Sequence, residues 1–238
     1  MVGFGYDDPI LTTFPAVVGG VLHATRLSNE PSSPALQEAF LVEQEEVKTR
    51  LGDRPLSEVP SLAAWRRVFS GFGVKPTQYR SAAESLLRRL TKQGDIPSIN
   101  TLVDVANLVS IRYALPVAVF DQATVAGMTT VRFATGDEPF TDLGSDTVTY
   151  PIEGEVIFVD ETPLVSARRW CWRQSAQSAA GLQTAEALIT IEGHHDSAER
   201  DVAAAVGDIL ALLQTHQPDS TTTHTVLSAA DPRFDFSS

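Results

Sequence analysis

Three polar side chains form one row within an apolar stretch of the sequence. Asn100, Asp104 and Asn107 stand at i, i+4 and i+7, a spacing that places them on one face of a helix. Leu, Val and Ile fill most other positions from 100 to 113, so most of this helix should be buried. Buried polar groups need hydrogen-bond partners. We therefore expect either a helix cap with satisfied core polar groups or, as the favoured interpretation, a pocket wall in which Asp104 holds an amine or guanidinium.

Three arginines flank two tryptophans in the run RRWCWRQ, residues 168–174. As a strand, this run would place Arg168, Trp170, Trp172 and Gln174 on one face, and the residues between them, including Arg173, on the other. Arginine with tryptophan suits phosphates and stacked bases or riboses. The alternative is a core tryptophan pair flanked by surface arginines.

The remaining candidates are weaker. Glu155 precedes a strand and is either a surface charge or a carboxylate at the edge of a site. His194, His195 and Asp196 have no third metal ligand at a recognised spacing, and Cys171 is expected to be a packed core residue. We expect no metal and no cofactor. An enzyme with these residues would position a water beside a reactive ester and stabilise the developing charge with fixed donors.

Hydrophobic periodicity predicts the elements that position these residues. Helices dominate the first half and strands the second, so the fold class is mixed α/β. One domain is expected over residues 1–216, followed by a polar, flexible tail over 217–238. Asp196 and Glu199 suggest a capping box at the last helix. The predicted helices are 34–51, 61–69, 79–93, 100–113 and 197–215, and the predicted strands are 13–25, 116–120, 128–133, 156–160, 169–174 and 185–191.

Charge is unevenly distributed along the 238 residues. With 18 Lys and Arg against 30 Asp and Glu, the net charge is −12, which argues against bulk affinity for nucleic acid. Residues 65–92 nevertheless hold seven bases, Arg80 and Arg88 among them, and one acid, Glu84. This block is either a solvated helix face or a local binding site for an anion. The start of the sequence lacks a secretory pattern and no apolar stretch is long enough to span a bilayer, so we expect a cytoplasmic protein without membrane partners.

Several runs resemble a known family. The run GVKPTQYRSAAESLLRRLTKQGDIPSINTLVDVANLVSIRYALPVAVFD is similar to the core of the B3/B4 domain, the editing domain of the phenylalanyl-tRNA synthetase beta subunit. The later runs VRFATGDEPF, GEVIFVD, ARRWCWRQS and TAEALITIEG are similar to its second half. The resemblance covers about Phe14 to Leu213, and its motifs are typical of freestanding members. It implies helices packed on a largely antiparallel or mixed sheet.

The resemblance implies an aminoacyl-tRNA deacylase, an ester hydrolase that removes a wrong amino acid from tRNA in trans. The synthetase domain removes tyrosine from phenylalanine tRNA, and freestanding members are associated with removing canavanine from arginine tRNA. The synthetase has a glutamate where Gln174 and Ser175 stand here, which argues against tyrosine. The expected substrate is canavanyl-tRNA(Arg); the alternatives are tyrosyl-tRNA(Phe) and a non-catalytic module that binds tRNA or an amino acid.

The resemblance also implies roles for individual residues. The polar row on the helix over 100–113 would hold the aminoacyl group, and water would be the nucleophile. The expected partner is a mischarged tRNA. The expected state of the protein is a monomer or a small homo-oligomer. Arg168 and Arg173 would hold the terminal phosphates, while Asp104 and Glu155 would give the pocket an acidic lining. The predicted catalytic residues are Asn100, Asp104 and Asn107, and the predicted substrate- and tRNA-binding residues are Arg80, Arg88, Glu155, Arg168, Trp170, Trp172, Arg173 and Gln174.

Overall fold

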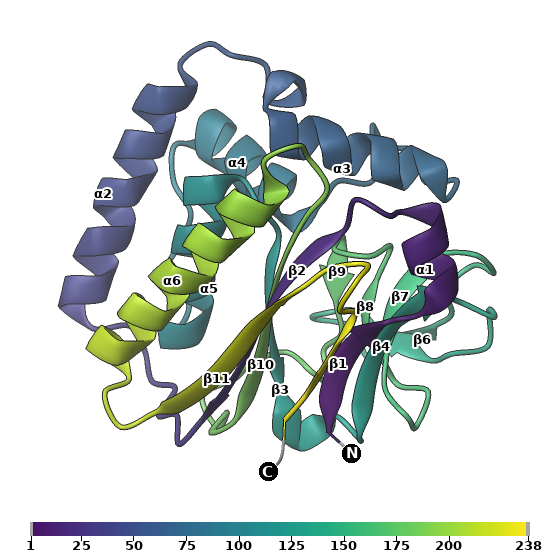
Figure 1. Ribbon diagram of the computed structural model, residues 1–238. Helices are drawn as coiled ribbons and strands as arrows, with labels where there is room; N and C mark the ends of the chain where they lie inside the picture. Colours follow the sequence, from purple (N-terminus) through teal and green to yellow (C-terminus); the bar gives the residue numbers. More distant parts are fainter. Residues whose placement is uncertain (1, 237–238) are drawn as a thin grey trace.

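The computed structural model describes residues 2–236 as two β-sheets packed together, with a layer of helices outside the first sheet (Figure 1). The first sheet has the order β11-β2-β10-β3, and each neighbouring pair is antiparallel. Its strands are β2 (Val18–Thr25), β3 (Val117–Asp121), β10 (Ala187–Gly193) and β11 (Thr221–Leu227).

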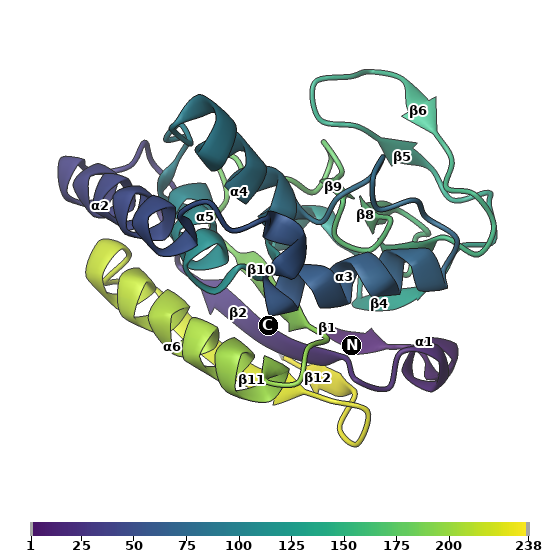
Figure 2. The same cartoon turned by 90° about the horizontal axis from the view of Figure 1, so that it is seen from above.

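The second sheet has the order β12-β1-β4-β7-β8-β9. Strands β1 and β4 run parallel and the other neighbours are antiparallel, so this sheet is mixed. A hairpin of two short strands, β5 (Phe140–Thr141) and β6 (Val148–Thr149), projects beside it (Figure 2). The strands of the second sheet are β1 (Gly3–Tyr6), β4 (Met128–Phe133), β7 (Val156–Val159), β8 (Val165–Arg168), β9 (Arg173–Gln174) and β12 (Arg233–Asp235).

Helices cover the outer face of the first sheet, with α6 and α5 packed directly on its strands. The predicted mixed α/β class, with helices packed on mixed sheets, is confirmed. Across residues 2–236, none of the helices has the length and apolar character needed to cross a membrane. The α-helices are α1 (Asp8–Thr13), α2 (Pro34–Leu51), α3 (Pro60–Gly71), α4 (Ala82–Gln93), α5 (Thr101–Tyr113) and α6 (Ala198–His216), and the 3₁₀ turns are Leu56–Glu58 and Gln122–Thr124.

Capping residues set the ends of α4 and α5. The side chain of Asn100 accepts a hydrogen bond from the Val103 amide at 3.0 Å, so the predicted N-cap of α5 is confirmed. Ser81 caps α4 through the Glu84 amide, which is why this helix begins at Ala82 rather than at residue 79. Gly94 ends α4 in the left-handed conformation, with φ of 90°.

The structure corrects three local predictions. The strand predicted over 13–25 begins only at Val18, because Asp7 caps the short helix α1 and Pro9 lies in its first turn. The strand predicted over 169–174 is broken by a turn. The capping box at α6 does not form, since Ser197 is the N-cap and its hydroxyl donates to Asp201 at 2.8 Å.

The expected flexible tail after residue 216 is also wrong over most of its length. Strand β11 pairs with β2 along seven residues, and β12 pairs with β1. The run TTTHTVL is rich in β-branched residues, which favour a pleated and half-buried strand. Both sheets are therefore completed by the C-terminal segment; residues 237–238 lie outside the described part of the chain.

Strand β10 separates two hydrophobic cores, because its side chains alternate between two faces. Ala187, Ile189 and Ile191 belong to the core beneath the helices. Leu188 belongs to the core between the two sheets. Thr190 and Glu192 continue the face of Leu188, so two polar side chains point toward the space between the sheets.

Candidate functional site

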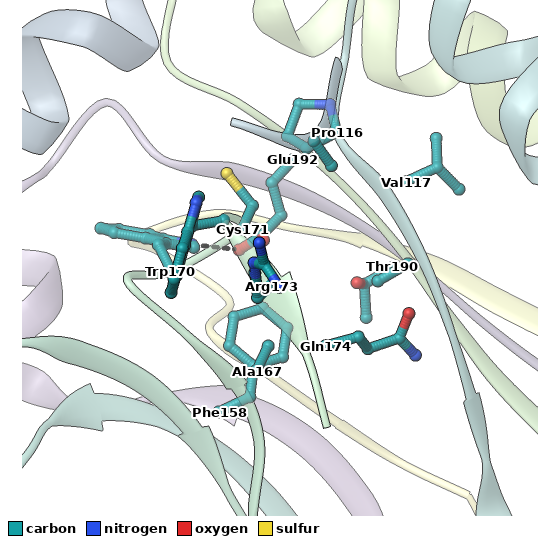
Figure 3. A pocket seen from close by; sticks show the side chains of 13 residues that line it. Pro116, Val117, Phe158, Ala167, Trp170, Cys171, Arg173, Gln174, Thr190 and Glu192 are labelled. Carbon is teal, nitrogen blue, oxygen red and sulfur yellow. Dashed lines mark hydrogen bonds between the residues drawn. The ribbon is translucent and has the colours of Figure 1, made fainter. Parts of the chain in front are cut away.

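The candidate site is a cavity between the two sheets, close to the point where β10 meets the turn after β8. It is walled by β10, the start of β3, the 169–172 turn, β9 and the first residue of α4. Its volume is about 400 Å³ when the open mouth is included. Figure 3 shows Trp170 and Cys171 on one side of this cavity and Val117, Thr190 and Gln174 on the other. Most of the lining is apolar, so the few polar groups determine what chemistry it can support.

Glu192 is the most unusual polar group in the cavity. Its side chain is 2% exposed, and its Oε1 accepts a hydrogen bond from Tyr6 Oη at 2.7 Å. The same oxygen accepts a hydrogen bond from Trp170 Nε1 at 2.9 Å (Figure 3). No residue in the described part of the chain donates to Oε2. Burial raises the pKa of Glu192 to about 7, although the two hydrogen bonds pull the pKa downward. A carboxyl group anchored through one oxygen and titrating near neutral pH suits a general base.

Trp170 reaches Glu192 only because the chain makes a tight turn after β8. Arg169 and Trp170 have φ of 45° and 61°, a left-handed conformation that is strained for bulky residues. Buried Glu155 stabilises this turn: it accepts two bonds from the Arg168 guanidinium, at 2.9 and 3.0 Å, and one from the Arg169 amide at 3.0 Å. The Trp170 amide also bonds to the Val156 carbonyl at 2.7 Å.

This geometry changes the roles expected for Glu155 and Arg168. Glu155 is 4% exposed and is neither a surface charge nor a free carboxylate facing the cavity. Arg168 is 7% exposed and its guanidinium is engaged with that carboxylate, so it does not face a ligand. Together they form a buried ion pair that supports the turn, and neither of them is among the residues that line the cavity.

Three of the predicted binding residues do meet at the cavity mouth. Trp172, Arg173 and Gln174 all line the cavity. The Arg173 guanidinium lies 4.8 Å from the Trp172 ring and pairs with Asp142 at 3.1 Å, with about half of its side chain exposed. The Gln174 amide donates to the carbonyl of Val119, which ties β9 to the first sheet.

Arg169 does not line this cavity; it lines a neighbouring pocket, where its cation lies between two aromatic rings. Its guanidinium lies 4.0 Å from the Tyr79 ring and 4.4 Å from the Trp172 ring. Burial lowers the pKa of Arg169 from its ordinary value. Trp170, by contrast, is fully buried and packs edge-on against Trp65 and Phe14. Trp170 forms part of the buried wall of the cavity, and neither face of its ring is exposed for a base to stack on.

The row of Asn100, Asp104 and Asn107 lies on the helical side of the first sheet and does not line the cavity. Asp104 is 0% exposed and accepts hydrogen bonds from the Ser32 hydroxyl at 2.5 Å, from the Ser98 hydroxyl and from the Ile99 amide at 2.9 Å. This carboxylate has no exposure with which to hold a substrate amine. The pocket-wall interpretation is corrected, and capping with satisfied core polar groups describes Asn100 and Asp104.

The basic candidates from residues 65–92 lie elsewhere on the surface. Arg80 pairs with Glu84 at 3.5 Å and donates to the Thr77 carbonyl at 2.8 Å. Arg88 lines a separate groove on the far half of α4. The structure therefore brings neither arginine into the cavity.

The remaining reactive side chains have structural surroundings. Burial lowers the pKa of His194 to about 3, and its ring packs edge-on against Trp65 and Trp170. His195 bonds to Asp201 at 2.9 Å. Within residues 2–236, no three His, Cys, Asp or Glu side chains are grouped so as to hold a metal ion. Burial raises the pKa of the Cys171 thiol well above its usual value, so this residue lines the cavity as a neutral thiol.

Sequence reasoning missed Glu192 and Thr190. The pattern contained a usable indication: in ALITIEG the apolar residues at 187, 189 and 191 fix one buried face. Leu188 shows that the other face is also buried. An acid in such a strand is therefore expected to face the interior, where it needs a specific purpose or partner.

Comparison with known proteins places this fold in a family. The family described as the B3/4 domain matches residues 64–207, more than half of the chain. The chain belongs to the B3/4 domain family. The match includes α4, the turn, β9 and β10, and thus most of the cavity wall in this B3/4 domain protein.

Two relatives can be named for this B3/4 domain protein. It is 31% identical over 99 residues to the phenylalanine–tRNA ligase beta subunit of Shewanella oneidensis, a match that covers 42% of this chain and 12% of that protein. It is also similar to the crystal structure of an N-terminal fragment of the phenylalanyl-tRNA synthetase beta subunit from Pyrococcus horikoshii, with 10% identity and a TM-score of 0.49. That likeness covers 94% of this chain and 54% of the fragment. The chain thus spans about an eighth of the curated relative and about half of the solved fragment.

Proposed function

We propose that this protein is an aminoacyl-tRNA deacylase that hydrolyses the ester of a mischarged tRNA. The observation that carries the proposal is Glu192, a buried carboxyl group with one anchored oxygen at a cavity between the sheets. Membership of the B3/4 family and partial similarity to a tRNA ligase subunit support a tRNA-linked substrate. The reaction proposed is hydrolysis with water as the nucleophile.

In this mechanism Glu192 acts as the general base. Its Oε2 takes a proton from a water molecule as the water oxygen attacks the aminoacyl carbonyl. The tetrahedral intermediate then collapses, the bond between the carbonyl carbon and the ribose oxygen breaks, and the ribose oxygen takes the proton back from Glu192, which returns to the carboxylate. The products are a free amino acid and uncharged tRNA. Tyr6 and Trp170 keep the carboxylate in position because both donate to its other oxygen.

The favoured substrate is canavanyl-tRNA(Arg), with tyrosyl-tRNA(Phe) as the alternative. Val117, Phe158 and Ala167 give the cavity apolar walls, which penalise a fully charged guanidinium. The guanidine of canavanine is less basic than that of arginine, so it enters such walls at a lower desolvation cost. This difference supports acceptance of canavanine and rejection of arginine. Gln174, which bonds Val119, offers an amide rather than a carboxylate to the ligand.

The test is deacylation of a panel of charged tRNAs by substoichiometric protein. The panel holds canavanyl- and arginyl-tRNA(Arg) with tyrosyl- and phenylalanyl-tRNA(Phe). The proposal expects many turnovers on one mischarged species, loss of that activity in Glu192→Gln and retention in Glu199→Gln, where an exposed glutamate on α6 changes. If the protein instead protects charged tRNA from hydrolysis and shows no turnover, the deacylase proposal is wrong and the protein is a binding module.

A further inference from the structure

A basic groove lies between α3, α4 and the segment 52–57, separate from the cavity. Resting on the proposed function, we infer that this groove binds the sugar-phosphate backbone of the RNA whose esterified 3′ end enters the cavity. Its volume is about 800 Å³ including the open side. Figure 2 shows α3 and α4 as neighbouring helices on one side of the molecule.

Cations predominate along this groove. The two acids that line it are Asp53 and Glu84. Glu84 is 3% exposed and is already engaged: Arg66 donates to both of its oxygens, at 3.0 Å from Nε, and Arg80 pairs with it at 3.5 Å. Its charge is therefore neutralised within the protein. The cations that line the groove are Arg54, Arg66, Arg88 and Lys92.

Arg88 and Lys92 form a like-charged pair on one face of α4. They are exposed and stand at i and i+4, an arrangement that weakens a helix. Neither forms an ion pair within residues 2–236. The adjacent Arg89 differs, because it pairs with Asp95 at 3.5 Å and donates to the carbonyl of the same residue at 3.0 Å. Two cations without a carboxylate, in a chain of net charge −12, point to an anion from outside the protein.

Helix α4 connects the groove to the cavity. Ala82, its first residue, lines the cavity and donates its amide to the Cys171 carbonyl at 2.8 Å. Lys92 follows ten residues later, about 15 Å along the helix axis. Successive phosphates of one strand of a DNA duplex are spaced by about 3.4 Å along its axis, and at that spacing this length corresponds to about four phosphates. The groove therefore lies at a suitable distance for the nucleotides that precede an esterified 3′ end.

The groove chemistry favours phosphate over an acidic protein surface. Leu56 is its one large apolar lining residue, whereas protein interfaces usually have an apolar or aromatic centre. Guanidinium groups match phosphate oxygens with paired hydrogen bonds, and Arg54 and Arg88 supply two of them, since the Arg66 guanidinium is engaged with Glu84. The exposed faces outside the groove carry the excess of acids and repel a polyanion, which restricts where RNA can approach.

The test measures the binding of uncharged tRNA as a function of salt. The variant Arg88→Gln/Lys92→Gln removes the two exposed cations, and Arg89→Gln on the same helix is the matched control. The inference expects the magnitude of the negative slope of log K against log salt to fall by about 2 in the double variant, with little change in the control. Equal slopes in all three proteins would overturn it. So would equal loss of binding to polyglutamate, because the groove would then select any polyanion. Circular dichroism checks that α4 remains folded.

Uncharged tRNA carries no aminoacyl ester, so this measurement is independent of deacylation. If no charged tRNA is cleaved but the slope still falls in the double variant, the deacylase proposal fails and the groove stands. If cleavage is observed and the slopes do not differ, the groove fails and the deacylase stands.

Discussion

Trp170 donates its indole N–H to the carboxylate of Glu192 at 2.9 Å, joining a strained turn to the central strand β10. Tyr6 on β1 donates to the same oxygen at 2.7 Å. One carboxyl group is thus positioned by a strand from each sheet and by a turn. Since these donors use Oε1, the orientation of Glu192 is fixed through one oxygen, and no described residue donates to Oε2.

Glu192→Gln should abolish most hydrolysis while leaving substrate binding nearly intact. The amide keeps an acceptor for Tyr6 and Trp170 but cannot take a proton. Loss of a general base lowers the rate by about 10² to 10⁴-fold. Single-turnover rates from pH 5 to 8 should rise through about 7, where Glu192 becomes the carboxylate, and this step should vanish in the variant. A variant that retained the rate and the step would assign the base to another group.

Trp170→Phe should move the pH profile of hydrolysis to higher pH. The indole hydrogen bond lowers the pKa of Glu192, so removing it raises the pKa above about 7 and leaves less carboxylate at neutral pH. Trp65→Phe is the matched control, because the Trp65 indole donates to the backbone carbonyl of Glu192 rather than to its carboxylate. Identical profiles for the two variants would show that the indole bond does not tune Glu192.

Glu192 should also make the fold less stable as the pH rises. Its folded pKa of about 7 lies above its ordinary value of 4.5, so the folded state holds an extra proton between these values. The free energy of unfolding should therefore be highest below pH 4.5 and should decrease by about 3 kcal/mol as the pH rises through 7. Urea unfolding at pH 5 and 8 should show this loss in the wild type. Glu192→Gln should be more stable than the wild type at pH 8, and a pH-independent difference would contradict the argument.

Much of this fold follows from sequence periodicity, whereas the site does not. The α5 helix was predictable because Asn100 is a recognisable cap and apolar residues surround it. The break at Arg169 and Trp170 was not, since both residues disfavour positive φ and the turn is held by Glu155 and Val156 at the start of another strand. The role of Asp104 was not predictable either: its carboxylate is taken up by nearby Ser98 and Ile99 and by Ser32, which lies 72 residues away. Local patterns locate elements, but hydrogen bonds between distant segments decide which polar groups face the cavity.

His194 should make the protein sensitive to acid. Burial and the neighbouring His195 lower its pKa to about 3, below its ordinary value of 6.5. The unfolded state therefore binds the extra proton, and stability falls as the pH decreases from 6.5 toward 3. The loss should reach about 2 kcal/mol at pH 5. His194→Phe keeps an aromatic ring against Trp65 and Trp170, so its stability should change less between pH 7 and 5. Equal losses in both proteins would locate the acid sensitivity elsewhere.

Arg168→Ala distinguishes a supporting ion pair from a phosphate contact. Removing the guanidinium leaves the Glu155 carboxylate buried without its main partner, which should lower the free energy of unfolding by about 3–5 kcal/mol. The turn that holds Trp170 should loosen, so hydrolysis should fall even on a small aminoacyl ester without phosphates. Arg173→Ala is the comparison, because its exposed guanidinium should affect stability by less than about 1 kcal/mol. A stable Arg168→Ala protein impaired only on full-length tRNA would instead assign Arg168 to phosphate binding, as its position in the sequence first suggested.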